Sequence, residues 1–147
     1  MTSDEARAAF DTARVARLAS VASDGAPHLV PIVFALDGNA IVTAVDAKPK
    51  RSTALRRLGN IAANPRVTLL VDGYDDDWDR LWWARADGAA RVVDDGPDHR
   101  RAIDLLHARY AQYATVEISG PVVVVEVARW SGWEATELAR DVRNGRG

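Results

Sequence analysis

The sequence predicts a mostly β protein, an antiparallel barrel of six strands with three peripheral helices. Short apolar runs rich in β-branched residues follow one another, and Asp-Gly turns separate the first of them. This pattern is the strongest short-range signal of antiparallel hairpins. Strands and helices do not alternate regularly, and no G-x-G-x-x-G segment follows a strand. A doubly wound parallel sheet is therefore disfavoured.

Length and composition predict a single domain over residues 1–147. Hydrophobic residues make up 48% of the chain and charged residues 27%, as in an ordinary globular domain. A net charge of −2 argues against broad electrostatic capture of nucleic acid or of an acidic membrane. The sequence has no cysteine, which excludes disulfides and thiolate metal sites. No apolar stretch approaches the ~18 residues of a membrane helix, so we expect a cytoplasmic protein.

The first half of the chain is predicted to form one helix and then a three-stranded meander. Residues 2–5 have the S/T-x-x-E form of a capping box, and alanines and a phenylalanine follow at helical spacing. Three apolar runs come next, separated by Ser23-Asp24-Gly25 and Asp37-Gly38-Asn39. We expect these runs to be consecutive antiparallel strands. They cover residues 15–22, 28–36 and 40–45.

The second half is predicted to contain two helices and the remaining strands. A helix over residues 52–63 places Leu55, Leu58 and Ala62 on one face and stops at Asn64-Pro65. Beyond Gly96-Pro97, apolar residues at helical spacing predict an amphipathic third helix. The remaining extended runs cover residues 67–71, 81–86, 89–93 and 121–130. The last of them is too apolar for an exposed edge, so we expect it in the centre of the sheet.

The most informative segment for function is the basic start of the helix at residues 52–63. Both lysines of the protein, Lys48 and Lys50, lie here with Arg51, Ser52 and Thr53. Cations are unfavourable at a helix N-terminus unless an anion is shared between them. Basic side chains, hydroxyls and free N–H groups together form a reasonable phosphate cradle. The alternative is a solvated basic corner in which Ser52 simply caps the helix.

Other candidate residues have plausible structural roles. His28 either faces a ligand or bonds the adjacent turn, while His99 and His107 are too far apart on one helix to share a metal, ~12 Å at 1.5 Å per residue. The aspartates of residues 72–79 lack the order of a calcium loop, so no metal site is predicted. Neighbouring Trp82 and Trp83 must point to opposite faces of a strand. Hydrolase motifs are missing, so a bound cofactor is the most economical source of reactivity.

Several segments together resemble the pyridoxamine-phosphate-oxidase-like split β-barrel flavoproteins. The resemblance covers nearly the whole chain and begins with Arg-Val-Ala-Arg-Leu-Ala-Ser-Val and Asp-Gly-Ala-Pro-His-Leu-Val-Pro-Ile-Val-Phe, followed by the basic helix start. More specific segments are similar to the actinobacterial branch of deazaflavin-dependent enzymes. They are residues 45–50, 55–58, 60–65 and 77–88.

The resemblance implies a six-stranded split β-barrel of the FMN-binding type that forms a homodimer with cofactor sites between the subunits. Members bind FMN or coenzyme F-420 (8-hydroxy-5-deazaflavin), and some bind haem. The family's phosphate-binding residues match Lys48, Lys50, Arg51, Ser52 and Thr53. Its ring-edge contacts match Pro31, Ile32, Val33, Thr43 and Ala44, and His28 falls at a pocket-lining position. The resemblance assigns no catalytic residue.

The leading hypothesis is a coenzyme F-420-dependent oxidoreductase that transfers hydride between the deazaflavin and a small organic substrate. The basic helix start suits an anionic coenzyme, and Arg56 and Arg57 could extend the electrostatic track beyond the phosphate. One alternative is an FMN-dependent oxidase or reductase of the pyridoxamine-phosphate-oxidase type. The other is a non-enzymatic protein that binds flavin or haem.

Overall fold

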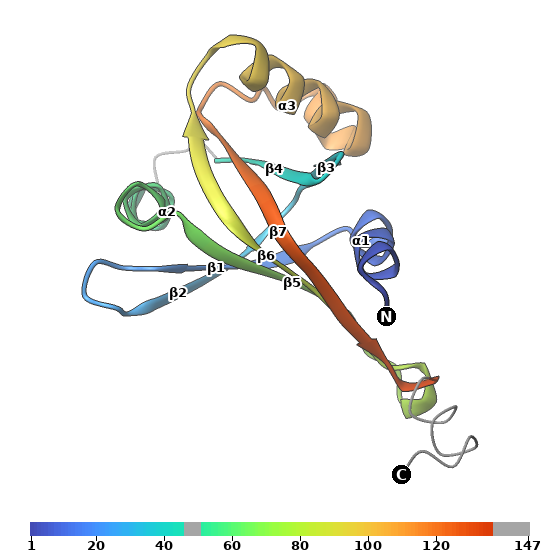
Figure 1. The fold of residues 1–147 in the computed structure, drawn as a ribbon. Helices are drawn as coiled ribbons and strands as arrows, with labels where there is room; N and C mark the ends of the chain where they lie inside the picture. The colour runs from blue at the N-terminus through green and yellow to red at the C-terminus, as the bar shows by residue number, and fades with distance from the viewer. Residues whose placement is uncertain (46–50, 137–147) are drawn as a thin grey trace.

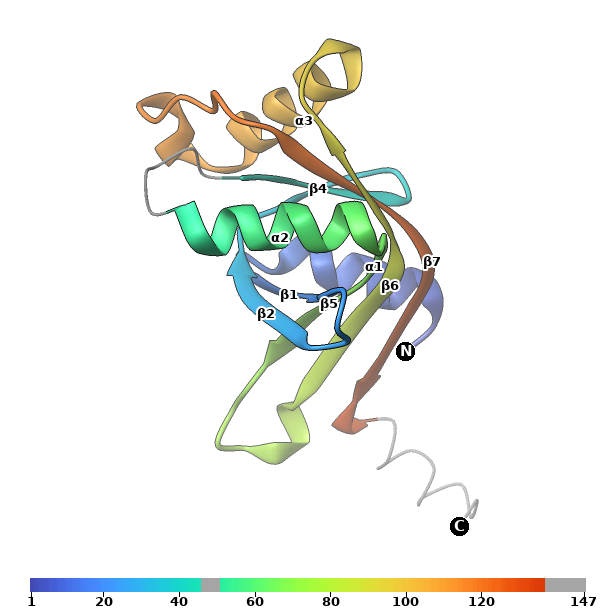
Figure 2. The ribbon, with the colours of Figure 1, turned by 90° about the vertical axis from the view of Figure 1, so that its left-hand side faces the viewer.

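The computed structural model describes residues 1–45 and 51–136, with only the main chain of residues 51–55. Over these residues, seven strands form one sheet in the order β2-β1-β5-β6-β7-β4-β3, and all neighbouring strands are antiparallel. The sheet is strongly curled (Figures 1 and 2), and buried apolar side chains fill its interior. The strands are β1 (Ala16–Val21), β2 (Pro27–Ile32), β3 (Ala35–Asp37), β4 (Ala40–Ala44), β5 (Arg66–Gly73), β6 (Trp82–Val93) and β7 (Val122–Glu134).

Three α-helices within the described chain pack around this sheet. They are α1 (Ser3–Thr12), α2 (Arg51–Ala63) and α3 (Gly96–Arg109). The predicted cap of the first helix is confirmed, because Thr2 Oγ1 accepts the amide proton of Glu5 at 3.1 Å. Figure 2 shows α2 lying across β1 and β6. Among the described residues no helix is long and apolar enough to cross a membrane.

The antiparallel class and the central place of the last strand are confirmed, since β7 lies between β6 and β4. The predicted six strands and the three-stranded meander are wrong. The second apolar run breaks at Val33 and Phe34 into β2 and β3, and β2 and β3 lie at opposite ends of the strand order. Their hairpins are formed separately, β1 with β2 and β3 with β4. The two turns are as predicted, with Gly25 and Gly38 at φ of 86° and 58°.

The two extended runs predicted at residues 81–86 and 89–93, which follow the acidic loop of residues 72–79, also differ from the prediction. They form one long strand, β6, interrupted only by a bulge at Asp87 and Gly88. A Cβ atom on Gly88 would collide with the carbonyl oxygen of Glu126 on β7. The bulge therefore requires the close backbone approach that glycine permits.

Two apolar clusters fill the interior. The larger joins the curled sheet to α1 and α2 through Phe10, Phe34 and Ile61, and Trp130 packs edge-to-face on Phe10. The smaller lies between α3 and the sheet around Leu106 and Tyr110. The predicted apolar face of α2 is rotated, because Ala62 is exposed whereas Arg57, Asn60 and Ile61 are buried.

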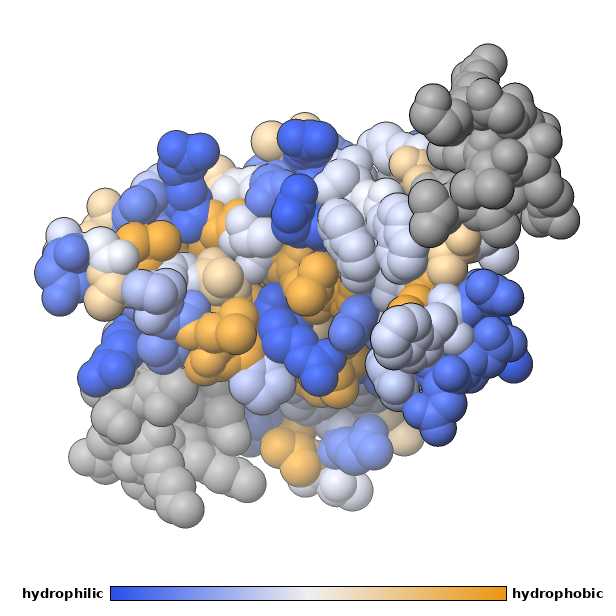
Figure 3. Space-filling model, turned by 90° about the horizontal axis from the view of Figure 1, so that it is seen from below, coloured by the Kyte–Doolittle hydropathy of each residue, from blue (hydrophilic) through white to orange (hydrophobic). Residues whose placement is uncertain are grey.

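One face of the β2-β1-β5 part of the sheet carries exposed apolar residues. Arg17 pairs with Pro31 on one side and with Leu70 on the other, so these three side chains share that face. Leu29 on the same face is 66% exposed. Seen from below, the surface shows hydrophobic residues gathered between hydrophilic ones (Figure 3).

Candidate functional site

A cavity of about 270 Å³ lies where the ends of β2 and β4 meet the segment between α3 and β7. The strand wall contains all five residues predicted to contact a cofactor ring, so the structure brings them together. They are Pro31, Ile32, Val33, Thr43 and Ala44, joined by Val45. Tyr113 and residues 116–119 form the second wall, and Arg57 of α2 completes the lining.

The strand wall contains an internal hydrogen bond. Thr43 is buried, and its hydroxyl donates a hydrogen bond to the carbonyl oxygen of Val33 at 2.7 Å. The proton of Thr43 is therefore used within the wall, and the hydroxyl can offer a ligand only an acceptor. Ile32 belongs to the main apolar cluster. This side of the cavity is thus a preformed apolar surface with few polar groups.

Arg57 is the charged residue that α2 contributes to the cavity lining. Its side chain is only 8% exposed, and its Nε atom has no hydrogen-bond partner among the described residues. Burial lowers the pKa of this guanidinium below its ordinary value, because desolvation penalises the charged form. A buried cation without a counter-charge is costly. An anion bound in the cavity would remove that cost.

The sequence interpretation placed Arg57 on an outer electrostatic track, whereas the structure places it in the cavity. The burial of Arg57 is indicated by the spacing of its neighbours along the helix. Residues three and four apart share a helix face, and Asn60 and Ile61 follow Arg57 at those distances. All three are buried. An arginine on the buried face of a helix points to a site more directly than an arginine on the exposed face.

The predicted phosphate cradle is described only in part. Lys48 and Lys50 lie outside the described residues. The main chain places Arg51, Ser52 and Thr53 in the first turn of α2, as predicted for the helix start. Arg57 follows Arg51 by six residues, which corresponds to about 9 Å along a helix. The helix start and the cavity therefore belong to the same end of the molecule.

His28 is not among the residues that line the cavity. It lies on β2 opposite Ser20, on the sheet face where Asn60 of α2 donates a hydrogen bond to the Ser20 hydroxyl at 3.3 Å. The Nδ1 atom of His28 is buried and has no partner among the described residues. The structure thus places His28 on the sheet face next to this contact, and its predicted role in lining a cofactor pocket stays a prediction.

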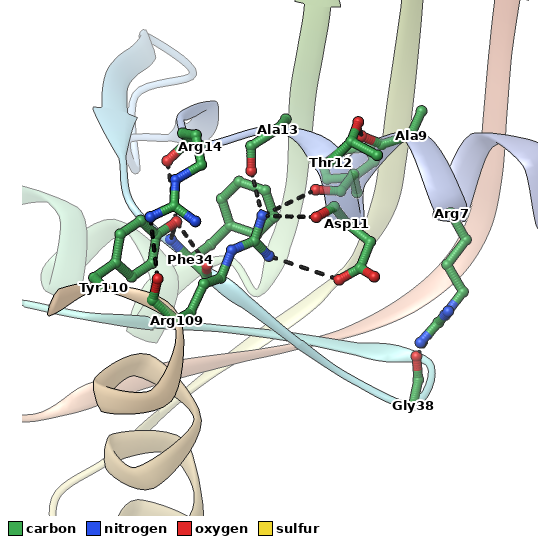
Figure 4. Close-up of polar contacts among 11 residues, drawn as sticks. Arg7, Ala9, Asp11, Thr12, Ala13, Arg14, Phe34, Gly38, Arg109 and Tyr110 are labelled. Atoms are coloured by element: carbon green, nitrogen blue, oxygen red, sulfur yellow. Dashed lines mark hydrogen bonds and ion pairs between the residues drawn. The ribbon is translucent and has the colours of Figure 1, made fainter.

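The second wall is anchored at both of its ends. Before it, the Tyr110 hydroxyl lies 2.8 Å from the carbonyl oxygen of Phe34 and 3.0 Å from that of Arg14 (Figure 4). Arg109 donates to carbonyl groups at the end of α1, including that of Ala13 (Figure 4). After the wall, His99 Nε2 donates to the carbonyl oxygen of Gly120 at 2.9 Å.

The remaining candidates lie away from this cavity. None of the five tryptophans is among its described lining residues. Trp82 and Trp83 do point to opposite faces, since Trp82 packs on the main cluster and Trp83 lies opposite Trp133 on the other side. Trp78 is 69% exposed in the acidic loop. The described residues contain no group of three metal-binding side chains.

Comparisons with known proteins address the fold and the family. The family model described as pyridoxamine 5'-phosphate oxidase matches residues 2–134. A search of curated proteins finds no match. The fold is similar to that of the conserved hypothetical protein Rv2991 of Mycobacterium tuberculosis, with a TM-score of 0.76 and 22% identity over 95% of this chain and 88% of that protein.

Two further solved structures are named for their ligands. An FAD-binding protein of Mesorhizobium loti matches with a TM-score of 0.71 and 21% identity, over 90% of this chain and 92% of its own. A heme binding protein of Mycobacterium smegmatis matches with a TM-score of 0.70 and 19% identity, over 95% of this chain and 60% of its own. At these identities the structures establish the fold alone. Because the family model spans almost the whole sequence, the chain belongs to the pyridoxamine 5'-phosphate oxidase family, whose fold is the FMN-binding split barrel.

Proposed function

We propose that this protein is a deazaflavin-dependent oxidoreductase that uses coenzyme F-420 for hydride transfer with a small organic substrate. The observation that carries the proposal is the cavity in which an apolar strand wall meets the buried Arg57, whose Nε atom has no hydrogen-bond partner among the described residues. Family membership supports flavin-type chemistry in general. The choice of the deazaflavin rests on the resemblance of the segments around the basic helix start and β6 to the deazaflavin branch.

The cavity residues fit a ligand with a flat apolar ring and an anionic group. The lining is largely apolar, as in most cofactor sites, with a small number of polar groups. A charge-assisted hydrogen bond to Arg57 would satisfy its buried Nε atom. Both flavins and deazaflavins carry a planar ring and a phosphate, so the lining suits either of them.

We assign roles to this chain's residues as follows. Pro31, Ile32 and Val33 with Thr43 and Ala44 contact the edge of the ring and exclude water from it. Arg57 pairs with an anionic group of the cofactor, and the start of α2 holds the phosphate through Lys48, Lys50, Arg51, Ser52 and Thr53. When bound, the coenzyme supplies the hydride chemistry. The protein's contribution is orientation of the two reactants in a water-poor site.

We further propose that the protein acts as a homodimer with its cofactor sites between the subunits. The face that carries Arg17, Leu29, Pro31 and Leu70 supports this arrangement. Leu29 and Leu70 are 66% and 36% exposed, and a second copy would bury them. Pro31 belongs both to this face and to the cavity lining. A partner on this face would therefore stand next to the proposed ring site.

Two alternatives remain distinct from the leading proposal. An FMN-dependent oxidase or reductase would use the same cavity. The second alternative is a non-enzymatic protein that binds flavin or haem. Solved structures of the same fold that are named as FAD-binding and heme binding proteins support this alternative. The alternatives differ from the proposal in ligand preference and in turnover, and both can be measured directly.

A parallel titration of the purified, cofactor-free protein with F-420, FMN and haem tests the proposal. We expect F-420 to bind most tightly, followed by oxidation of the reduced coenzyme in the presence of an electron-poor acceptor. Preference for FMN would move the protein to the flavin branch. Preference for haem, or binding without any turnover, would favour the non-enzymatic alternative.

The matched variants Arg57→Met and Arg56→Met test the assignment of Arg57. Arg57 is buried in the cavity wall, whereas its neighbour Arg56 is exposed. Loss of one charge-assisted bond of ~1.5–3 kcal/mol should weaken binding by about ten-fold to a hundred-fold in Arg57→Met. Arg56→Met removes only an exposed, solvent-screened charge of the predicted electrostatic track and should weaken binding much less than Arg57→Met. Equal affinities in the two variants would contradict the role of Arg57.

A further inference from the structure

Tyr110, which follows directly after α3, contacts both walls of the cavity, and we propose that it is a positioning residue that fixes the spacing between them. The proposal rests on the proposed function, because it takes the cavity as the site of the cofactor ring. It gives a role in cofactor binding to a buried side chain that does not itself line the cavity.

The hydroxyl of Tyr110 holds the strand wall. It accepts the Phe34 amide proton at 3.0 Å and lies 2.8 Å from the Phe34 carbonyl oxygen. Phe34 directly follows Val33, which lines the cavity and whose carbonyl oxygen accepts a hydrogen bond from Thr43. Val33 and Phe34 form the break between β2 and β3, where the described chain pairs them with no neighbouring strand. Two side-chain hydroxyls therefore hold the main chain of the wall at this point.

The main chain and the ring of Tyr110 hold the second wall. The Tyr110 carbonyl oxygen accepts the Tyr113 amide proton at 3.1 Å, and the two rings meet edge-to-face with their centroids 6.1 Å apart. Tyr113 lines the cavity, and the ring of His107 stacks on it at a centroid distance of 6.0 Å. The start of the second wall is thus placed relative to Tyr110.

Tyr110 is itself firmly placed. It is only 6% exposed and belongs to the smaller apolar cluster. Its hydroxyl also lies 3.0 Å from the carbonyl oxygen of Arg14 (Figure 4). The guanidinium groups of Arg14 and Arg109 lie 4.7 Å and 5.8 Å from the centroid of its ring, and such cation–π contacts add to the effect of burial. A side chain held in this way keeps the two walls at one spacing.

The spacing of the walls decides how well a flat ring fits between them. Dispersion attraction between apolar atoms falls by roughly a quarter to a half when a gap of about 0.5–1 Å opens. Without the Tyr110 hydroxyl, the buried amide and carbonyl groups of Phe34 lose their described partner, and the main chain must shift to find another. Val33 would shift with it. The ring contact would then weaken although no side chain that lines the cavity has changed.

The test compares Tyr110→Phe with Trp130→Phe in the full-length protein. Each variant removes one buried hydrogen-bond donor and retains an aromatic ring. Trp130 donates to Asn39 at 2.6 Å, and neither of these two residues lines the cavity. Tyr110→Phe should weaken binding of F-420 or FMN about ten-fold, the equivalent of one hydrogen bond. Trp130→Phe should bind within about two-fold of the wild type, because it leaves both walls in place.

The spectrum of the bound cofactor separates a positioning role from a loss of stability. Both variants are saturated with F-420 or FMN at a temperature at which far-ultraviolet circular dichroism shows them folded. Tyr110→Phe should change the fluorescence emission and the visible circular dichroism of the bound ring, since the surroundings of the ring shift. Trp130→Phe should leave both spectra as in the wild type.

Three results would count against the positioning role. Wild-type affinity and wild-type ring spectra in folded Tyr110→Phe would overturn it and leave the proposed function standing. Equal changes in the two variants would also overturn it, because they would show a general effect of lost stability. Binding of neither F-420 nor FMN by the wild type would overturn the proposed function and the positioning role with it.

Discussion

The phenolic oxygen of Tyr110 satisfies both main-chain polar groups of Phe34. It accepts the Phe34 amide proton at 3.0 Å and lies 2.8 Å from the Phe34 carbonyl oxygen, although the two residues are 76 positions apart. Phe34 is fully buried and lies between β2 and β3, where it is paired with no neighbouring strand among the described residues. Tyr110 therefore takes the place of a strand partner at the point where the sheet divides.

Tyr110→Phe should lower the free energy of unfolding by about 1–3 kcal/mol, because it leaves a buried N–H and a buried C=O group without a partner. Chemical denaturation followed by tryptophan fluorescence measures the change. Tyr74→Phe is the control, since Tyr74 is 74% exposed and loses no buried bond. Equal stability of the two variants would show that Tyr110 does not stabilise the break between β2 and β3.

The Asp37–Arg101 pair predicts a pH dependence of stability. Two hydrogen bonds from Arg101, at 2.7 and 2.8 Å, hold the pKa of the Asp37 carboxyl below its ordinary value. The resulting stabilisation is present above the unfolded pKa of about 3.9 and is lost as the pH falls through the lower folded pKa. The stability advantage of the wild type over Arg101→Met should therefore shrink below about pH 4.

Denaturation curves at a series of pH values test this dependence. Arg100→Met serves as the control, because Arg100 is exposed and has no described ion pair. Its stability difference from the wild type should change less across the acid range. An Arg101→Met difference that stays constant from neutral to acid pH would contradict the role of the pair.

Two glycines of the chain should respond oppositely to alanine. Gly88→Ala should destabilise the protein by about 1–3 kcal/mol, since the new Cβ atom meets the backbone of β7 at the bulge. Gly59→Ala should stabilise it by about 0.5–1 kcal/mol, because Gly59 lies in α2 and no atom of the described residues lies within 4 Å of the place of an added Cβ atom. Thermal unfolding of both variants measures the two shifts. A neutral Gly88→Ala would show that the bulge can relax.

Lys50→Ala combined with Arg51→Ala should weaken cofactor binding by more than a hundred-fold. Each charge-assisted bond to a phosphate is worth about 1.5–3 kcal/mol, and the change removes two cations from the start of α2. Fluorescence titration with F-420 or FMN provides the measurement. Arg100→Ala with Arg129→Ala removes the same charge from exposed positions elsewhere and should have little effect. Similar losses in both pairs would indicate a general charge effect instead of a cradle.

Local signals in the sequence were sufficient for most elements of the fold. The capping residue Thr2, the turns at Gly25 and Gly38 and the stop at Asn64-Pro65 act on their immediate neighbours, and the structure confirms the elements that they delimit. The five ring-edge residues were predicted through resemblance, and they do line one cavity.

The break at Val33 and Phe34 could not be predicted in the same way. These residues continue an apolar run with no turn residue, and the group that replaces their strand partner comes from Tyr110 at the end of α3. The rotation of α2 has a similar origin. Its buried face is set by the sheet and cavity on which it packs, so that Arg57 lies inside and Ala62 outside.

By itself the sequence determined the antiparallel β class, the position of the helices, the central place of the last strand and the family. Each depends on hydrophobic periodicity, turn chemistry or motifs that neighbouring residues carry. Only the tertiary structure decided the seven-stranded order, the burial of Arg57 in the cavity and the place of Val116 on its second wall. These features depend on contacts between residues far apart in the chain, and such contacts arise only when the sheet closes around its core.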